Sequence, residues 1–363
     1  MKDPRLRLSV VIMTLQVLGQ TVLGFRLSIA QVLVAISTSL LLEAGITLYR
    51  GGDLKWPASA MLTGNGVALL LRTVGTRHGD WWSLNGAEYF AIAAVLGIAS
   101  KHLVRPFGRH IYNPSNLGLV LTFILAGPAH VYPQYLWWGP MGVPVAAAWL
   151  VIIAGAIWVL RPIRMWPMVL AFAIPFALIV AGFAAGGACF DAIWRRDSVC
   201  GANYWIGIAA SPEVAIFVLF MMSDPRTSPR APVARAVYGL LTALVAAGLL
   251  YLQQTEFGIK VSILAALTIV CTLVPLIEMV SARRRAATTD VGQPRGAPGG
   301  WAEPRGAALP AAAVAAAVIT LGVSGAVVAM GQNQELVRYE RGTAVPGGDS
   351  PRQQGAAASA LEI

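Results

Sequence analysis

The chain has 363 residues, of which 56% are hydrophobic and 12% are charged, and its mean hydropathy is +0.65. Soluble domains normally carry about twice that charged fraction, so this composition excludes a soluble globular protein. The formal charge of +10 comes from Lys and Arg residues that gather in short clusters between apolar runs. This pattern is typical of cytoplasmic loops and excludes a nucleic-acid-binding groove. The composition therefore predicts an all-α, polytopic membrane protein.

Span-length apolar runs follow one another along residues 1–282. A bilayer core about 30 Å thick needs about 20 apolar residues per helix, so cutting the chain at charges and turn residues predicts ten core spans. A linker rich in Pro, Gly and Arg is expected at 283–306, an additional Ala-rich transmembrane helix at 307–331, and a polar, disordered tail at 332–363. A peripheral helix is the alternative for 307–331. The ten predicted spans are residues 8–25, 27–48, 57–72, 88–104, 114–131, 143–160, 166–188, 205–222, 236–253 and 260–279.

The distribution of basic residues predicts the orientation of the chain. A cytoplasmic amino terminus places most Lys and Arg residues of the loops on the inside, as the positive-inside rule requires. We therefore expect a multi-pass protein of the bacterial cytoplasmic (inner) membrane, surrounded by lipid. If the eleventh span crosses the membrane, the carboxyl tail lies outside.

Turn residues interrupt several spans at comparable places in the two halves of the chain. Such breaks are typical of internally repeated membrane folds, which use discontinuous helices to place backbone groups at membrane depth. A division into two five-helix halves would match this pattern. The interrupting residues are Pro57, Gly64 and Gly66 in the third span, Gly108, Pro114 and Gly118 at the fifth, and Pro212, Asp224 and Pro225 at the eighth.

Three carboxylates fall within predicted spans: Glu43, Glu213 and Glu278. An intramembrane carboxylate is costly unless it is paired, protonated or directed into a polar cavity, so these residues are candidates for an ion or proton path. Glu213, near mid-span, is the strongest candidate. The alternative for Glu43 and Glu278 is that each snorkels to the interface or pairs with a nearby Arg. The four histidines show no metal-ligand spacing, and no metal site is predicted.

The three cysteines are too few for a Cys-ligated iron–sulfur cluster. Cys189 and Cys200 lie in one loop that the charge distribution places outside, where the environment is oxidising. This placement predicts a Cys189–Cys200 disulfide, with Cys271 left as a reduced, apolar-packed thiol. The alternative is that Cys189 is only a small hydrophobe at a helix end.

Two short segments combine helix-capping residues with expected positions on the cytoplasmic side. In the first, residues 108–118, Asn113 can cap a helix whose first residue is Pro114, which leaves free backbone amides directed at a ligand. In the second, residues 221–229, Asp224 and Thr227 can close a turn after a helix. Each segment taken alone is as consistent with a structural cap as with a binding site.

Together these segments resemble a known family. An Asn-Pro motif after a Lys-His-bearing span, then Met-Ser-Asp-Pro-Arg-Thr-Ser-Pro, then Tyr-Gly, resembles the D subunit of the Rnf electron-transport complex and the B subunit of sodium-pumping NADH:quinone oxidoreductase (RnfD/NqrB). The resemblance covers about 280 residues and extends to Asp3-Pro4-Arg5 and Ala60-Met-Leu-Thr-Gly64. It implies ten core helices arranged as two inverted five-helix repeats, related to urea transporters, that hold flavin and pass electrons.

The chain departs from this family where the family attaches its flavin. Those subunits bind FMN covalently through a Thr in an outer loop, but this chain has no Thr between Thr122 and Thr227. We therefore expect no covalent FMN. The resemblance implies a divergent, stand-alone member that holds riboflavin or FMN noncovalently. The expected flavin site comprises Asn113, Pro114, Asn116, Asp224 and Thr227.

Three functions fit these observations. The first is a membrane-embedded electron-transfer component, an oxidoreductase or electron-transport subunit, that works with a cytoplasmic redox partner or with other membrane subunits. The second is a channel or transporter for a small solute on the same fold, with Glu213 lining the path. The third is an accessory or assembly role. The retained Asn-Pro and Asp-Pro segments favour electron transfer, whereas the missing Thr favours transport.

Overall fold

A computed structural model describes residues 4–53, 56–105, 109–135, 142–193, 197–277 and 308–333. The described chain is mostly helical, with two short two-stranded sheets. The linker at 283–306, the tail beyond residue 333 and Glu278 lie outside the described residues, so the predictions made for them stay predictions. The elements are α1 (Pro4–Thr21), α2 (Ile29–Tyr49), α3 (Ala58–Leu70), β1 (Leu71–Thr73), α4 (Ala87–Leu103), α5 (Pro114–Ala126), β2 (Val131–Pro133), α6 (Val143–Ile163), α7 (Trp166–Ala185), β3 (Cys189–Phe190), β4 (Val199–Cys200), α8 (Gly201–Ala209), α9 (Pro212–Ile216), η1 (Phe217–Met221), α10 (Pro232–Tyr251), α11 (Glu256–Cys271) and α13 (Ala308–Gln332).

Six stretches of the described chain are long and apolar enough to cross a membrane: α2, α6, α7, the run from α8 to η1, α10 and most of α13. The helices α3 and α5 are also apolar but have only 13 residues each, and each is followed within a few residues by a strand. At 1.5 Å per residue such a helix is about 20 Å long, shorter than a bilayer core. The described helices are those of a multi-pass membrane protein in which some membrane-depth helices are short.

The strands β1 and β2 that end these short helices pair antiparallel, with Arg72 opposite Tyr132. All six of their residues are buried. Non-helical backbone is tolerated at membrane depth only where protein or a water-filled cavity covers it, and here protein covers it. The sheet therefore allows α3 and α5 to stop short of a complete span.

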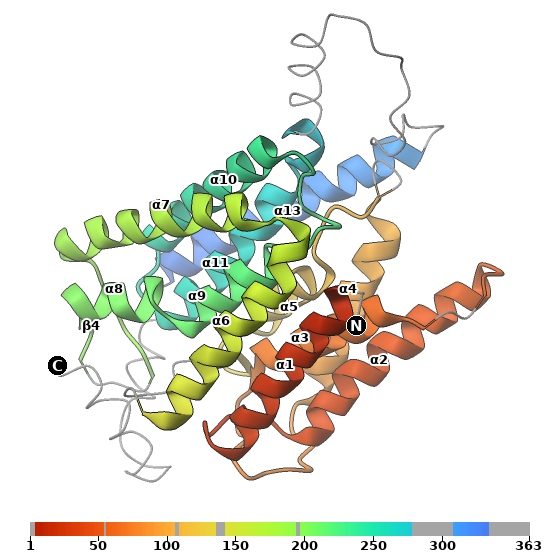
Figure 1. Ribbon diagram of the computed structural model, residues 1–363, viewed down its shortest axis with the longest axis horizontal. Helices are drawn as coiled ribbons and strands as arrows, with labels where there is room; N and C mark the ends of the chain where they lie inside the picture. The colour runs from red at the N-terminus through yellow and green to blue at the C-terminus, as the bar shows by residue number, and fades with distance from the viewer. Residues whose placement is uncertain are drawn as a thin grey trace, which may run out of the picture.

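The centre of the molecule is formed by α5 and α11, which are buried along almost their whole lengths. The two helices run antiparallel. Asn116, at the start of α5, contacts Leu264 and Thr268 late in α11, whereas Phe123, near the end of α5, stacks edge-on against Phe257 at the start of α11. Figure 1 shows α7 and α10 along one flank of the molecule and α1 and α2 along the opposite flank.

The expected glycine interruption of the third span is not a break in the helix. The helix α3 continues through Gly64 and Gly66. A Cβ atom at Gly64 would lie 2.5 Å from the carbonyl oxygen of Ala35 in α2, so the glycine is needed for the close approach of the two helices. The eighth span, in contrast, is divided as expected near Pro212: α8 ends at Ala209, α9 begins at Pro212, and η1 continues as a π-helix.

The helix α13 packs against α11 and α5. Tyr112, just before α5, donates a hydrogen bond to the carbonyl of Ala316 (3.1 Å), and Gln253, just after α10, donates one to the carbonyl of Val327 (3.0 Å). The first contact lies beside the start of α5 and the second beside the start of α11, so α13 runs in the same direction as α5 across the core.

Two opposite faces can now be defined. The Asn113 face carries Arg5 of α1, the start of α5 and the turn at Asp224. The Cys189 face carries β1, β2, the β3–β4 hairpin and the start of α11. The Lys and Arg distribution of the sequence predicts that the Asn113 face is cytoplasmic.

Candidate functional site

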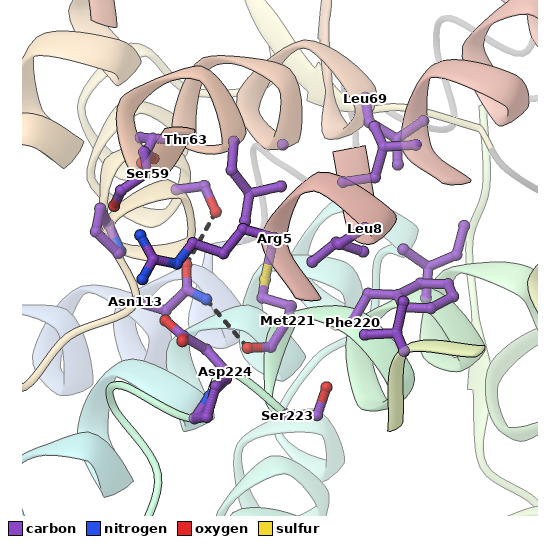
Figure 2. Close-up of a pocket in the computed structure, with 18 of the residues that line it drawn as sticks. Arg5, Leu8, Ser59, Thr63, Leu69, Asn113, Phe220, Met221, Ser223 and Asp224 are labelled. Carbon is purple, nitrogen blue, oxygen red and sulfur yellow. Dashed lines mark hydrogen bonds between the residues drawn. The ribbon is translucent and has the colours of Figure 1, made fainter. Parts of the chain in front are cut away.

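A cleft on the Asn113 face brings together the two segments singled out in the sequence (Figure 2). Asn113 and Pro114 line it from α5, and Asp224 and Pro225 line it from the turn after η1. The cleft has a volume of about 100 Å³. Its other walls are mainly apolar side chains of α1, α3, α6, α9 and η1: Leu8, Ile12, Leu62, Leu69, Leu70, Val159, Ile163, Ile216, Phe220 and Met221.

Asn113 has a structural role within this cleft. Its Oδ1 atom accepts hydrogen bonds from the backbone N–H of Asn116 (3.2 Å) and from Oγ of Ser115 (2.9 Å). Asn113 thereby caps the start of α5. Its Nδ2 atom donates to the carbonyl of Met221 (3.0 Å) at the end of η1. The side chain thereby ties the start of α5 to the end of η1, and the amide is engaged by protein groups on both of its polar atoms.

The π-helix η1 forms part of the cleft wall. Its wider turn is closed by the N–H of Met222, which donates to the carbonyl of Phe217 (2.8 Å). Phe220 and Met221 of this segment line the cleft. Single π-helical turns occur frequently at functional sites, because they redirect side chains that an α-helix would place elsewhere.

The polar groups at the mouth of the cleft carry opposite charges. Figure 2 shows the Arg5 guanidinium on the same side of the cleft as Asn113 and Asp224. Oδ1 of Asp224 accepts a hydrogen bond from the backbone N–H of Arg226 (2.9 Å). Loss of hydration raises the pKa of the Asp224 carboxyl, whereas this hydrogen bond and the positive charges of Arg226, Arg5 and Arg109 oppose the increase.

Cations predominate around this mouth. His110, in the loop before α5, has its pKa lowered to about 4, first by loss of hydration and then by the positive charges of Lys101, Arg226, Arg105 and Arg109. Arg109 also donates a hydrogen bond from Nη2 to the carbonyl of Arg226. The loops before α5 and after η1 are therefore held together in a positive field that favours an anionic ligand.

Two residues of the predicted flavin site lie outside the cleft. The Nδ2 atom of Asn116 donates to the Leu264 carbonyl and to Oγ1 of Thr268, both at 2.9 Å, so this side chain joins α5 to α11. Thr227 is buried, at 2% exposure, and its backbone N–H bonds the Asp224 carbonyl (3.3 Å). Asn113 is the N-cap residue, and its side chain turns back over the start of α5, whereas the Asn116 side chain projects from within the helix towards α11.

Glu43 lies in an ion-pair cluster near the Asn113 face. Its carboxylate contacts Nζ of Lys101 (2.6 Å) and Nε2 of His102 (2.8 Å), and Arg50 contacts the other ring nitrogen of His102 (3.3 Å). This arrangement corresponds to the alternative interpretation, in which Glu43 pairs with neighbouring basic groups. The predicted partner was Arg, whereas the carboxylate contacts Lys101 and His102 from α4.

Glu213 lies in a second buried ion cluster, on the Cys189 side. Its Oε1 atom is 3.1 Å from Nζ of Lys260, and Glu256 Oε1 is 2.8 Å from the same nitrogen. The sequence interpretation placed Lys260 in an outer loop and did not single out Glu256 or Arg72. The signal that could have revealed Lys260 is its i,i+4 spacing from Glu256, which places both side chains on one helical face.

The β3–β4 hairpin contains the disulfide that the sequence indicated. Cys189 and Cys200 are bonded, with Cα atoms 4.4 Å apart, and both residues are exposed. Cys271 is a buried free thiol whose sulfur lies 3.3 Å from the Tyr238 hydroxyl. Within the described residues, no group of three or more His, Cys, Asp or Glu residues has the geometry of a metal site.

The fold and the long apolar helices define the class of this chain as a multi-pass, mostly helical membrane protein. Comparison with protein-family models gives no match, and no curated protein matches the sequence significantly. The functional assignment therefore depends on the geometry of the cleft and of the buried charged groups.

Proposed function

We propose that this chain is a membrane-embedded electron-transfer component, a divergent relative of RnfD and NqrB, that binds riboflavin or FMN noncovalently in the cleft on the Asn113 face. The observation that carries the proposal is that Asn113-Pro114 and Asp224-Pro225, more than a hundred residues apart, line one cleft. A noncovalent flavin would supply one- or two-electron transfer at this position. A cytoplasmic donor, or another membrane subunit, would deliver the electrons.

The lining of the cleft fits a flavin in its chemistry. An isoalloxazine ring has an apolar dimethylbenzene end, which matches the walls formed by Leu8, Leu62 and Phe220. Its polar end, and the phosphate of FMN, match the cationic mouth at Arg5. Because the Asn113 amide is engaged by protein groups, Asn113 shapes the cleft, and Arg5 and Asp224 are the side chains that contact the polar part of the ligand.

The size of the cleft sets a condition on binding. Its volume of about 100 Å³ is below the roughly 300 to 1,000 Å³ of typical small-molecule sites. A three-ring flavin therefore enters only if the walls separate. The wall most suited to movement is η1, since a π-helical turn converts to an α-helical one by a shift of one residue.

The arrangement of helices supports the two inverted five-helix repeats of this proposal. The packing of α2 with α4 and of α4 with α5 is matched by the packing of α7 with α10 and of α10 with α11. Corresponding first and last helices also meet, α1 with α6 and α5 with α11. In this scheme α3 corresponds to the divided run from α8 to η1.

The absorption spectrum of the detergent-purified protein tests the proposal. We expect a yellow protein with flavin maxima, and acid or denaturant should release the chromophore because no Thr is present in the loops where the family attaches FMN. Fluorescence that stays with the denatured polypeptide would contradict noncovalent binding. A colourless protein that takes up neither riboflavin nor FMN when these are added would contradict the function itself.

The buried charges favour a second candidate, a channel or transporter for a small solute. Glu213, Glu256 and Lys260 lie inside the helical bundle beside the divided helix α8–α9, and discontinuous helices commonly form transport sites. Reconstituted vesicles distinguish the two functions. A transporter would move solute without bound flavin, and replacing Glu213 would abolish the flux, whereas an electron-transfer protein would show flavin reduction and no flux.

A further inference from the structure

Five residues on the Cys189 side form what we term the Lys260 cluster: Arg72, Tyr135, Glu213, Glu256 and Lys260. The Lys260 ammonium lies 2.8 Å from a Glu256 oxygen and 3.1 Å from a Glu213 oxygen. The side chains of Lys260, Glu213 and Glu256 are exposed by 14%, 15% and 8%, so all three are largely removed from solvent. Because α9 supplies Glu213 and α11 supplies Glu256, the two carboxylates meet only through the tertiary fold.

An aromatic ring completes the surroundings of the ammonium. Nζ of Lys260 lies 4.9 Å from the centroid of the Tyr135 ring, and the Arg72 guanidinium lies 4.0 Å from the same centroid. Arg72 itself is 4% exposed and also stacks on Tyr132 at 5.3 Å. The cluster thus contains two cations and two carboxylates, and its net charge is zero without any added ion.

Helix caps fix the backbone positions of both glutamates. Glu213 occupies the first turn of α9, where the Ser211 side chain caps the helix by accepting the N–H of Val214 (3.2 Å). Glu256 is the first residue of α11, which Thr255 caps, and its N–H donates to the carbonyl of Asp191 (2.9 Å). The ammonium, in contrast, is at the end of a flexible four-carbon stem. Two capped helix starts therefore place the glutamates around one point, and the longer Lys260 side chain reaches that point from within α11.

Two buried carboxylates beside an aromatic ring are the surroundings expected of a monovalent cation removed from water. We propose that the Lys260 cluster is a monovalent-cation site that the protein fills with its own Lys260 ammonium group. Without that group, the two buried carboxylates repel each other and take up Na⁺ or a proton. With the Lys260 ammonium in place, the cluster has no net charge and its cation position is occupied, so the wild-type protein binds no sodium here. A cation that crosses the protein at this point must first displace Lys260.

The proposal is independent of flavin binding, so its test uses thermal unfolding of the full chain in detergent. Wild-type protein and K260M are compared in NaCl and in choline chloride of equal ionic strength, across a pH series. Methionine retains the length of the lysine stem and removes the charge. K260M should melt lower than wild type in choline chloride, and either Na⁺, in a saturable manner, or acid pH should raise its Tm by several degrees. A rise in Tm with Na⁺ at neutral pH identifies sodium as the cation that replaces the ammonium group. A rise with acid alone identifies the proton in that role.

A matched control variant is K101M, because Lys101 also contacts a carboxylate and, among the residues that the structure describes, that of Glu43 is the only one within ion-pair distance. We expect no Na⁺-specific rise in the Tm of K101M. Three results would overturn the proposal: a Na⁺-specific rise in wild type, an equal rise in K101M and K260M, or a folded K260M that neither Na⁺ nor acid stabilises.

Should K260M fail to fold, the triple variant K260M/E213Q/E256Q decides the matter. A triple variant that folds shows that the single variant fails because its two carboxylates lack a cation, as the proposal requires. A triple variant that also fails shows that Lys260 is needed for packing alone, and it overturns the proposal.

Discussion

At the scale of single residues, side chains with the same sequence signature have different roles. Asn113 and Asp224 both flank a proline at a helix end, yet Asn113 is fully engaged in joining α5 to η1, whereas Asp224 faces the cleft beside Arg5. Which of the two can meet a ligand depends on the remaining hydrogen-bonding capacity of each side chain. Replacing Asp224 should therefore weaken ligand binding and leave the protein folded.

Replacing Asp224 with Ala should remove bound flavin while the protein still inserts and stays monodisperse. The lost hydrogen bond to the Arg226 N–H costs about 1 kcal/mol, too little to prevent folding. Flavin content per protein, measured after acid extraction, checks the prediction, with Asp80→Ala in another loop as the control. Full flavin content in Asp224→Ala would favour a purely structural turn.

His110 should make the protein less stable in acid. Its pKa is about 4 in the folded protein and about 6.5 when unfolded, so between these values the unfolded chain binds the proton more readily and stability decreases as the pH falls. Replacing His110 with Gln should flatten the decrease in Tm between pH 6.5 and pH 4. The same substitution at His78 serves as the control, and an unchanged slope in His110→Gln would contradict the assignment.

At the scale of elements, close helix contacts depend on particular glycines. A Cβ at Gly118 of α5 would lie 2.1 Å from the carbonyl oxygen of Ala93 in α4, a distance that no packed atom tolerates. The Asn-Pro cap and Gly118 therefore act together: the first starts α5 at the cleft, and the second lets α5 lie directly against α4.

Replacing Gly118 with Ala should destabilise the protein by about 3 kcal/mol, the upper end of the cost of overpacking, because the obstacle is backbone. Gly182 in α7 is the matched control, since no atom of the described part of the chain lies within 4 Å of the Cβ position there. Gly182→Ala should be neutral or slightly stabilising. Denaturant unfolding in mixed micelles measures both, and equal effects of the two substitutions would contradict the packing argument.

The disulfide should stabilise the β3–β4 hairpin and, through it, the start of α11. Asp191 follows this hairpin's first strand and exchanges backbone hydrogen bonds with Gln254 and Glu256. Replacing both Cys189 and Cys200 with Ser should lower the free energy of unfolding by about 2 to 3 kcal/mol. Thermal unfolding with and without reductant checks this, because reductant should lower the Tm of wild type but not that of the double variant.

At the scale of the whole molecule, α13 connects the two faces. Its contacts with Tyr112 and Gln253 at opposite ends of the core make its carboxyl end emerge on the Cys189 face. Residue 333 therefore lies on the same face as the disulfide hairpin, the Cys189 face, whereas the turn at Asp224 lies on the Asn113 face.

A cysteine at Asn333 should react with a membrane-impermeant maleimide in intact cells, and a cysteine at Arg226 should react only after permeabilisation. The expected sidedness follows from the excess of Lys and Arg in the loops of the Asn113 face. Cys271 is replaced with Ala in both variants so that the added thiol is the only free one. Labelling of both positions from the same side would contradict the course of α13.

The sequence alone determined the features that depend on local composition. Apolar runs of membrane length, the cap at Asn113, the break near Pro212 and the paired cysteines are each set by neighbouring residues, and each was predictable. The tertiary structure decided which distant groups meet. It directs Asn116 into the α5–α11 contact, pairs Glu43 with Lys101, and brings Lys260 between carboxylates of two helices. These outcomes depend on helix rotation and on the register between helices, and a shift of a single residue turns a side chain by about 100° around its helix.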